Sequence, residues 1–104
     1  MPFRPRWMAE HQPLVDDRLW RREPSVLFRA TPRSLIVFAR DGMEPVRVEG
    51  SAVVVWRMLE SPRRTSDVVA LVAREASASH DLVSSVVDDA LDILQRAGAV
   101  TCER

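Results

Sequence analysis

The first half of the chain carries short, dense runs of apolar residues that are typical of β-strands. Residues 26–31 (VLFRAT) and 35–40 (LIVFAR) are rich in β-branched and aromatic side chains, and a turn at Pro32 separates them. The second run is apolar on both faces, which predicts a central strand that is covered on both sides. A third run, 45–49 (PVRVE), follows the hairpin signal Asp41-Gly42 and alternates apolar with polar residues. Together these runs predict a three-stranded antiparallel sheet.

After Gly50 the apolar residues follow the period of α-helices. The first predicted helix begins near Ser51 and ends before Pro62. The second is announced by 65–67 (TSD), where Thr65 or Ser66 can cap the exposed amides. The third begins near 79–81 and ends at Gly98, a residue suited to the position after a helix. The order of elements predicts an α+β, winged helix-turn-helix-like domain, in which a three-stranded antiparallel sheet precedes a three-helix bundle.

The third predicted helix has a wider apolar face than one core contact needs. One arc, which should face the core, contains Val83, Val87, Ala90 and Leu94. A second arc beside it contains Leu82, Val86, Ile93 and Ala97. The second arc has two interpretations from sequence: additional core under the sheet, or one wall of a groove beside the third strand, with Asp89 and Arg96 at its rim.

Residues 1–24 differ in composition from the rest of the chain. Prolines at four positions interrupt any regular structure, and charged residues are frequent there. We interpret this segment as a partly ordered N-terminal arm whose tryptophans, Trp7 and Trp20, pack on a domain that covers residues 25–101. The alternative interpretation is an arm that contacts a partner.

Charge and cysteine content exclude several classes of protein. The 15 basic residues, all arginine, balance 15 acidic residues, whereas nucleic-acid binders normally have a basic excess or stripe. Cys102 is the only cysteine, so no disulfide can form within the chain, as is usual in a reducing cytosol. The first residues lack the apolar core of a signal peptide, and no run approaches the length of a membrane span. We therefore expect a soluble, cytoplasmic protein with no nucleic-acid or membrane partner.

Residue patterns that carry catalysis or bind cofactors are missing from the sequence. The chain has three glycines and no glycine-rich phosphate loop, and its two histidines, His11 and His80, lie far apart. Asp88 and Asp92 are one helical turn apart on the polar face, where solvated carboxylates are the usual interpretation. We expect no enzymatic activity, no cofactor and no metal site.

The run from Val26 to Val100 resembles the PqqD-like family, whose members are also called RiPP recognition elements. In the matching pattern the third strand leads directly into 50–59 (GSAVVVWRML), a break at 60–64 (ESPRR) precedes 65–69 (TSDVV), and the run closes with 86–100 (VVDDALDILQRAGAV). The resemblance covers about three quarters of the chain.

This resemblance implies a domain that binds the leader segment of a ribosomally synthesised precursor peptide. In this family the leader adds as a strand to the third strand, lies against the third helix, and is delivered to a modifying enzyme or leader peptidase. Strand addition obtains affinity from main-chain hydrogen bonds and selectivity from side-chain contacts. Arg47 would pair with an acidic leader residue if it points outward. The residues implied in peptide binding are Pro45, Val46, Arg47, Val48, Glu49, Leu82, Val86, Asp89 and Ile93.

Three other interpretations compete with or extend this one. A winged-helix DNA binder is disfavoured because the third helix carries Asp88, Asp89 and Asp92 and only one arginine, Arg96. A scaffold subunit that holds a partner enzyme without reading a peptide is harder to separate by sequence. An open strand edge also predicts a homodimer formed through that edge.

Overall fold

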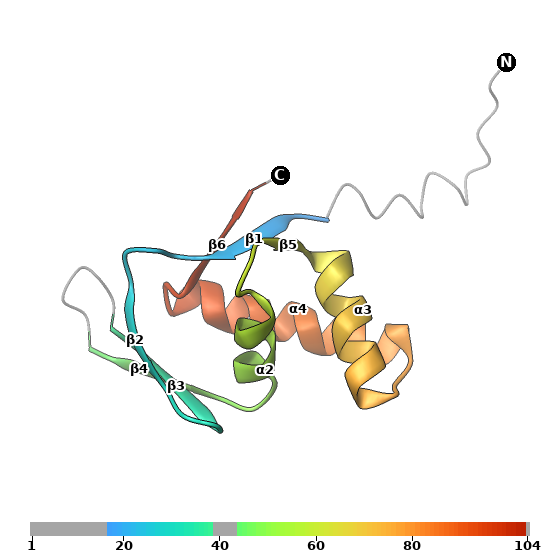
Figure 1. Cartoon of the computed structure of the whole chain (residues 1–104), viewed down its shortest axis with the longest axis horizontal. Coiled ribbons are helices and arrows are strands. Elements are labelled where there is room, and N and C mark those ends of the chain that lie inside the picture. The colour runs from blue at the N-terminus through green and yellow to red at the C-terminus, as the bar shows by residue number, and fades with distance from the viewer. Residues whose placement is uncertain (1–16, 39–43, 104) are drawn as a thin grey trace, which may run out of the picture.

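The computed structural model describes residues 17–38 and 44–103, which form two small sheets and three helices (Figure 1). Residues 1–16 of the expected arm and the Asp41-Gly42 hairpin signal lie outside the described residues. The α+β class and the three helices are confirmed, but the strands form two three-stranded antiparallel sheets instead of one. The elements are β1 (Leu19–Arg22), β2 (Leu27–Ala30), β3 (Ser34–Phe38), β4 (Val46–Glu49), α2 (Ser51–Met58), β5 (Arg63–Arg64), α3 (Thr65–Ala76), α4 (His80–Arg96) and β6 (Val100–Glu103).

The sheet that the sequence predicts has the strand order β2-β3-β4. Its inner face buries Leu35, Val37 and Val48 in the same core as α2 and α4. β3 is the central strand, as predicted, but it is not covered on both sides. Ile36 is half-buried and Phe38 is exposed on the outer face. β3 therefore carries more apolar side chains than the described fold buries.

The other sheet joins the two ends of the described chain, with the strand order β5-β1-β6. Its central strand, β1, lies within the segment expected to be an arm, so the folded unit begins before residue 25. The indole Nε1 of Trp20 donates to the Thr65 hydroxyl at 2.8 Å, and Trp20 itself is buried. Asp17 accepts hydrogen bonds from the amide and the hydroxyl of Ser66, both at 2.8 Å, at the N-terminus of α3. Because a carboxylate at a helix N-terminus satisfies free amides, this contact ties the segment to α3.

The helix ends agree with the sequence pattern. Ser79 accepts from the Leu82 amide as the N-cap of α4, and Gly98 has the positive φ of 78° that suits the end of this helix. The N-terminus of α3 differs in detail, because Arg64 occupies the cap position and its amide donates to Asp67 at 3.3 Å. The predicted core face of α4 is confirmed by the burial of Val83, Val87, Ala90 and Leu94.

Trp56 in α2 connects the two sheets. Its buried ring meets the Phe28 ring of β2 edge to face, with the ring centroids 4.5 Å apart. The guanidinium of Arg22, from β1, lies 3.5 Å from the centroid of the same ring. Arg22 also donates to the Trp56 carbonyl at 2.9 and 3.2 Å. Burial lowers the pKa of Arg22, and the Glu60 carboxylate opposes that shift.

Candidate functional site

β4 forms one edge of the β2-β3-β4 sheet. The alternation of hydrogen-bonding directions along the strands decides which of its main-chain groups are unpaired. The turn between β2 and β3 closes with the Thr31 amide donating to the Ser34 carbonyl at 2.9 Å. Because hydrogen-bonding directions alternate along an antiparallel strand, Ser34 points its main-chain groups to β2, whereas Leu35 and Val37 point theirs to β4. Their partners in β4 are Val48 and Val46, respectively. The main chains of these two valines therefore point inward, to β3.

The same alternation directs the other residues of β4 to the open edge. Arg47 and Glu49 each present an N–H and a C=O group there. Pro45, just before the strand, has no N–H and can only accept. Unpaired strand edges of this kind accept an additional strand. The edge thus offers alternating donors and acceptors at Arg47 and Glu49.

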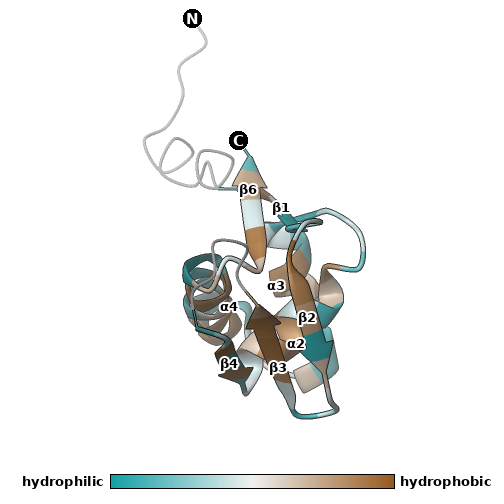
Figure 2. Ribbon diagram, turned by 90° about the vertical axis from the view of Figure 1, so that its left-hand side faces the viewer, coloured by the Kyte–Doolittle hydropathy of each residue, from teal (hydrophilic) through white to brown (hydrophobic). Residues whose placement is uncertain are grey.

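The second apolar arc of α4 divides in the structure. Leu82, Val86 and Ile93 are 63%, 37% and 48% exposed, whereas Ala97 is buried. Figure 2 shows α4 on the β4 side of the molecule. These three exposed apolar side chains follow one helical stripe, which makes the stripe a candidate interaction surface. The extra-core interpretation is therefore wrong for these three residues.

We call the unpaired edge of β4 together with the exposed stripe of α4 the edge surface. Its stripe consists of Leu82, Val86, Asp89 and Ile93, which follow one another at intervals of four, three and four residues. The predicted site residues do not all contribute in the same way. Val48 is buried in the core and offers no side chain to a ligand, while Val46 is 38% exposed.

The side chain of Arg47 is engaged within β4. Its Nε lies 3.0 Å from a carboxylate oxygen of Glu49, and both side chains are exposed. Side chains alternate along a strand, so Arg47 lies on the face opposite to the buried Val48. This places it on the outer face of the sheet. The interpretation that Arg47 recognises an acidic ligand residue thus has a competitor in Glu49.

Sequence reasoning missed a second exposed apolar surface on the outer face of the same sheet. Leu27 of β2 lies directly opposite Phe38 of β3, and the two side chains are 74% and 39% exposed. Half-buried Ile36 lies on the same face. Residues 35–40 are apolar on both faces, which could have indicated this exposed surface. We interpreted the pattern as a strand covered on both sides. We call these three residues the outer patch.

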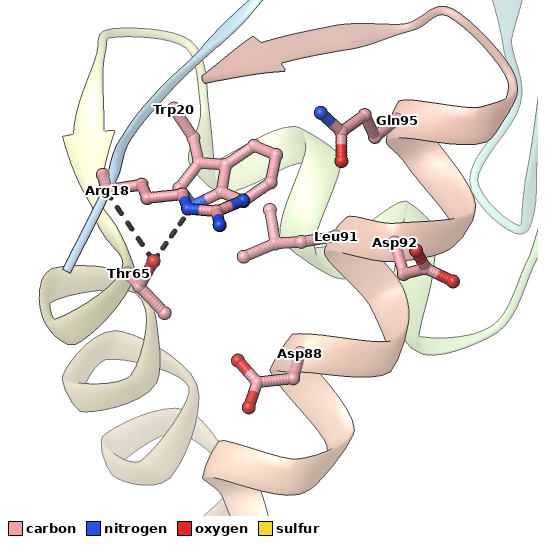
Figure 3. Close-up of a pocket in the computed structure, with 7 residues that line it drawn as sticks. All are labelled: Arg18, Trp20, Thr65, Asp88, Leu91, Asp92 and Gln95. Carbon is pink, nitrogen blue, oxygen red and sulfur yellow. Dashed lines mark hydrogen bonds between the residues drawn. The ribbon is translucent and has the colours of Figure 1, made fainter. Parts of the chain in front are cut away.

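A pocket lies on the side of α4 that faces β1 and α3 (Figure 3). Its volume is about 230 Å³, and Trp20 and Leu91 form apolar parts of its wall. The Thr65 hydroxyl in this wall is already bonded to Trp20. The lining also contains two carboxylates, a guanidinium and an amide. The lining residues are Arg18, Trp20, Thr65, Asp88, Leu91, Asp92 and Gln95.

Two other kinds of site have no candidate residues in the part of the chain that the structure describes. Within residues 17–38 and 44–103, no three His, Cys, Asp or Glu side chains converge in a way that suits a metal ion. None of the helices described is both long and apolar enough to cross a membrane.

Comparisons of the chain with protein-family models, with curated proteins and with solved structures give no match.

Proposed function

We propose that this protein is a non-catalytic recognition protein that binds the leader segment of a ribosomally synthesised precursor peptide by strand addition. It would then deliver the peptide to a modifying enzyme or leader peptidase in the cytoplasm. One observation carries the proposal: β4 has an open edge, α4 lies on the β4 side of the molecule (Figure 2), and α4 exposes Leu82, Val86 and Ile93. The resemblance to the PqqD-like family points to the same two elements.

The chemistry of the edge surface suits an extended peptide. Main-chain groups of Arg47 and Glu49 can pair with alternate residues of an added strand, and each such bond contributes about 0.5–1.5 kcal/mol net. Side chains on one face of that strand would contact the apolar stripe of α4. Backbone pairing gives affinity without sequence preference, so the stripe would supply the selectivity.

DNA binding is less consistent with the contacts of the basic residues. Arg63 donates to the Met58 carbonyl at 2.7 Å, and Arg64 donates to the Asp17 carbonyl at 2.9 Å. Both side chains are therefore used within the fold. The exposed surface of α4 includes Asp89 and Asp92, which would repel phosphates.

The direct test is a titration of the purified protein with synthetic leaders from short precursors encoded beside it. Calorimetry gives the affinity, and backbone amide shifts locate the contact. We expect a micromolar or tighter Kd, with shifts concentrated at 45–49 and 82–93. A scrambled leader of the same composition is the control. Shifts confined to other elements, or no binding by any neighbouring leader, would contradict the proposal.

Replacement of Arg47 by proline tests the open edge. Arg47→Pro removes an N–H that points to solvent, and proline is tolerated on edge strands. We expect leader affinity to fall at least about tenfold, since one hydrogen bond is lost and the proline ring obstructs the added strand. The melting temperature should change by only a few degrees. Arg47→Ala, which removes the side chain and keeps the amide, should bind the leader almost as well as the unmodified protein.

Replacement of Ile93 by aspartate tests the apolar stripe. Ile93 is about half exposed, so Ile93→Asp should lower the free energy of unfolding by only about 1 kcal/mol. Leader affinity should fall about tenfold or more, because the substitution places a carboxylate in an apolar contact. Calorimetric titration and thermal denaturation of the same preparation compare the two effects. A large loss of thermal stability with unchanged affinity would mean that Ile93 belongs to the core and not to the binding surface.

A second candidate function, a scaffold that docks on a partner enzyme, is favoured by the outer patch. Leu27, Phe38 and Ile36 form an apolar surface on the face of the sheet opposite to the core. A scaffold would use this patch and give no response to leader peptides. A homodimer through the β4 edge is a further proposal, and it predicts that leader peptide and self-association compete. Sedimentation velocity with and without peptide distinguishes these arrangements.

A further inference from the structure

Asp89 interrupts the apolar stripe of α4. Val86 precedes it by three residues and Ile93 follows it by four, so all three side chains lie on one side of the helix. Asp89 is exposed, and it makes no hydrogen bond or ion pair with any residue that the structure describes. A carboxylate therefore lies unpaired in the middle of the surface that a docked peptide would cover.

The basic residues nearest to this carboxylate in the chain and on β4 have other partners. Arg96, two turns farther along α4, pairs with Asp92 at 3.1 Å. Arg47 of β4 pairs with Glu49 on the outer face of the sheet. Neither side chain is paired with Asp89, so none of the described residues compensates its charge, which leaves the ligand to supply a cation.

We propose that the edge surface selects extended peptide segments in which a lysine or arginine lies between two apolar residues, in the order apolar–x–basic–x–apolar. The inference rests on the proposed function and specifies its ligand. A peptide that covers Asp89 removes water from its carboxylate, which is unfavourable unless a cation or donor replaces that water. A wholly apolar strand would leave the charge buried and unpaired. A basic side chain at this position forms a charge-assisted hydrogen bond instead.

The spacing of the stripe fixes the spacing of the motif. Leu82 and Val86 form one apolar end of the stripe, Ile93 forms the other, and Asp89 lies between them. From the middle of the first pair to Ile93, α4 rises about 13 Å. An extended strand advances about 13 Å over four residues, and residues i, i+2 and i+4 share a face. For a strand that runs along α4, residues i and i+4 therefore reach the apolar ends and residue i+2 reaches Asp89.

The motif is symmetric, so it applies to an added strand of either direction. For an added strand that runs along α4, parallel and antiparallel pairing with β4 both place the central residue over Asp89. The net charge of the whole chain is zero, so a preference for basic peptides would arise from this local carboxylate and not from a general acidic field.

The test uses a series of synthetic nine-residue peptides that differ only at the central position. The host peptide has the core Leu-Thr-Lys-Thr-Leu, and the central lysine is replaced by norleucine or by glutamate. Calorimetry measures each Kd, and amide shifts at 45–49 verify the site. We expect the norleucine peptide to bind at least about tenfold more weakly than the lysine peptide, and the glutamate peptide more weakly still.

Charge reversal in the protein completes the test. Asp89→Arg should invert the order, so that the glutamate peptide binds best. Asp81→Asn, a substitution of another exposed carboxylate of α4 outside the stripe, should leave the order unchanged. Equal affinity of all three peptides, or an order that Asp89→Arg does not alter, would overturn the inference and leave leader binding intact. If neither this series nor the neighbouring leaders bind, both the inference and the proposed function are overturned.

Discussion

Trp56→Ala is expected to lower the free energy of unfolding by about 4 kcal/mol, a large part of the stability of a domain of this size. The substitution removes a buried ring and leaves a cavity in the core. It also removes the edge-to-face contact with Phe28 and the ring beneath the Arg22 guanidinium. Since Arg22 belongs to β1 and Phe28 to β2, the loss weakens the attachment of both sheets to α2.

Urea denaturation followed by far-UV circular dichroism measures this change. Trp56→Phe is the matched control, because phenylalanine keeps an aromatic ring in the same place, and it should lose less than half as much stability. The hydrogen bonds from Arg22 end on the Trp56 main-chain carbonyl, so they are retained in both variants. A loss below about 1 kcal/mol for Trp56→Ala would show that the ring does not connect the sheets.

Val46→Pro is expected to cost about 1–3 kcal/mol in the free energy of unfolding, although its neighbour Arg47 accepts the same substitution. The difference comes from the direction of the two amides. Val46 pairs with Val37, and its N–H points to β3, so proline removes a bond of the ladder. The Arg47 amide points to the open edge and has no partner in the sheet to lose.

The two proline variants measured together test which main-chain groups of β4 pair with β3. Thermal and urea denaturation of both should give a large loss for Val46→Pro and a small one for Arg47→Pro. The opposite result would mean that the main chains of Val46 and Val48 face the open edge, and the peptide would then pair with those residues. Amide hydrogen exchange in the unmodified protein gives an independent check, because the Val46 amide should be more protected than the Arg47 amide.

The helices could be predicted from the sequence because their signals are local. In α4, the periodicity placed Val83 and Leu94 in the core, and Ser79 and Gly98 marked its ends. The strands β2, β3 and β4 were also accessible, since consecutive antiparallel strands are separated by short turns. In each of these elements, the residues that determine the structure lie only a few positions apart in the sequence.

The β5-β1-β6 sheet could not be predicted in the same way. β1 lies in a segment interrupted by proline, and β5 has only two residues. The four residues of β6 follow the last helix and resemble a tail by sequence alone. Each strand is too short to show a period, and its stability comes from partners far away in the chain. The buried position of Trp20 follows from that pairing and from its bond to Thr65.

The candidate site was predicted in its elements but not in its details. The sequence identifies β4 and the second arc of α4, but only the register shows that Arg47 and Glu49 supply the edge. Exposure separates Ile93 from Ala97, which the helical period groups together. That Asp89 has no ion-pair partner among the described residues is evident only when the partners of Arg47 and Arg96 are known. These facts depend on neighbours in three dimensions, which a single sequence does not specify.

The pairing of β1 with β6 has a consequence for how the molecule folds. Leu19 lies opposite Glu103, and the neighbouring Arg18 and Cys102 are 84 positions apart in the chain. Closing so long a loop is entropically unfavourable, whereas β2 and β3 close through a short turn. On the ribosome, β1 would be synthesised before β6 and would wait for this partner until the residues between the two strands had emerged. The closure of this sheet should therefore be a late event, and its rate should set the speed at which the native state forms.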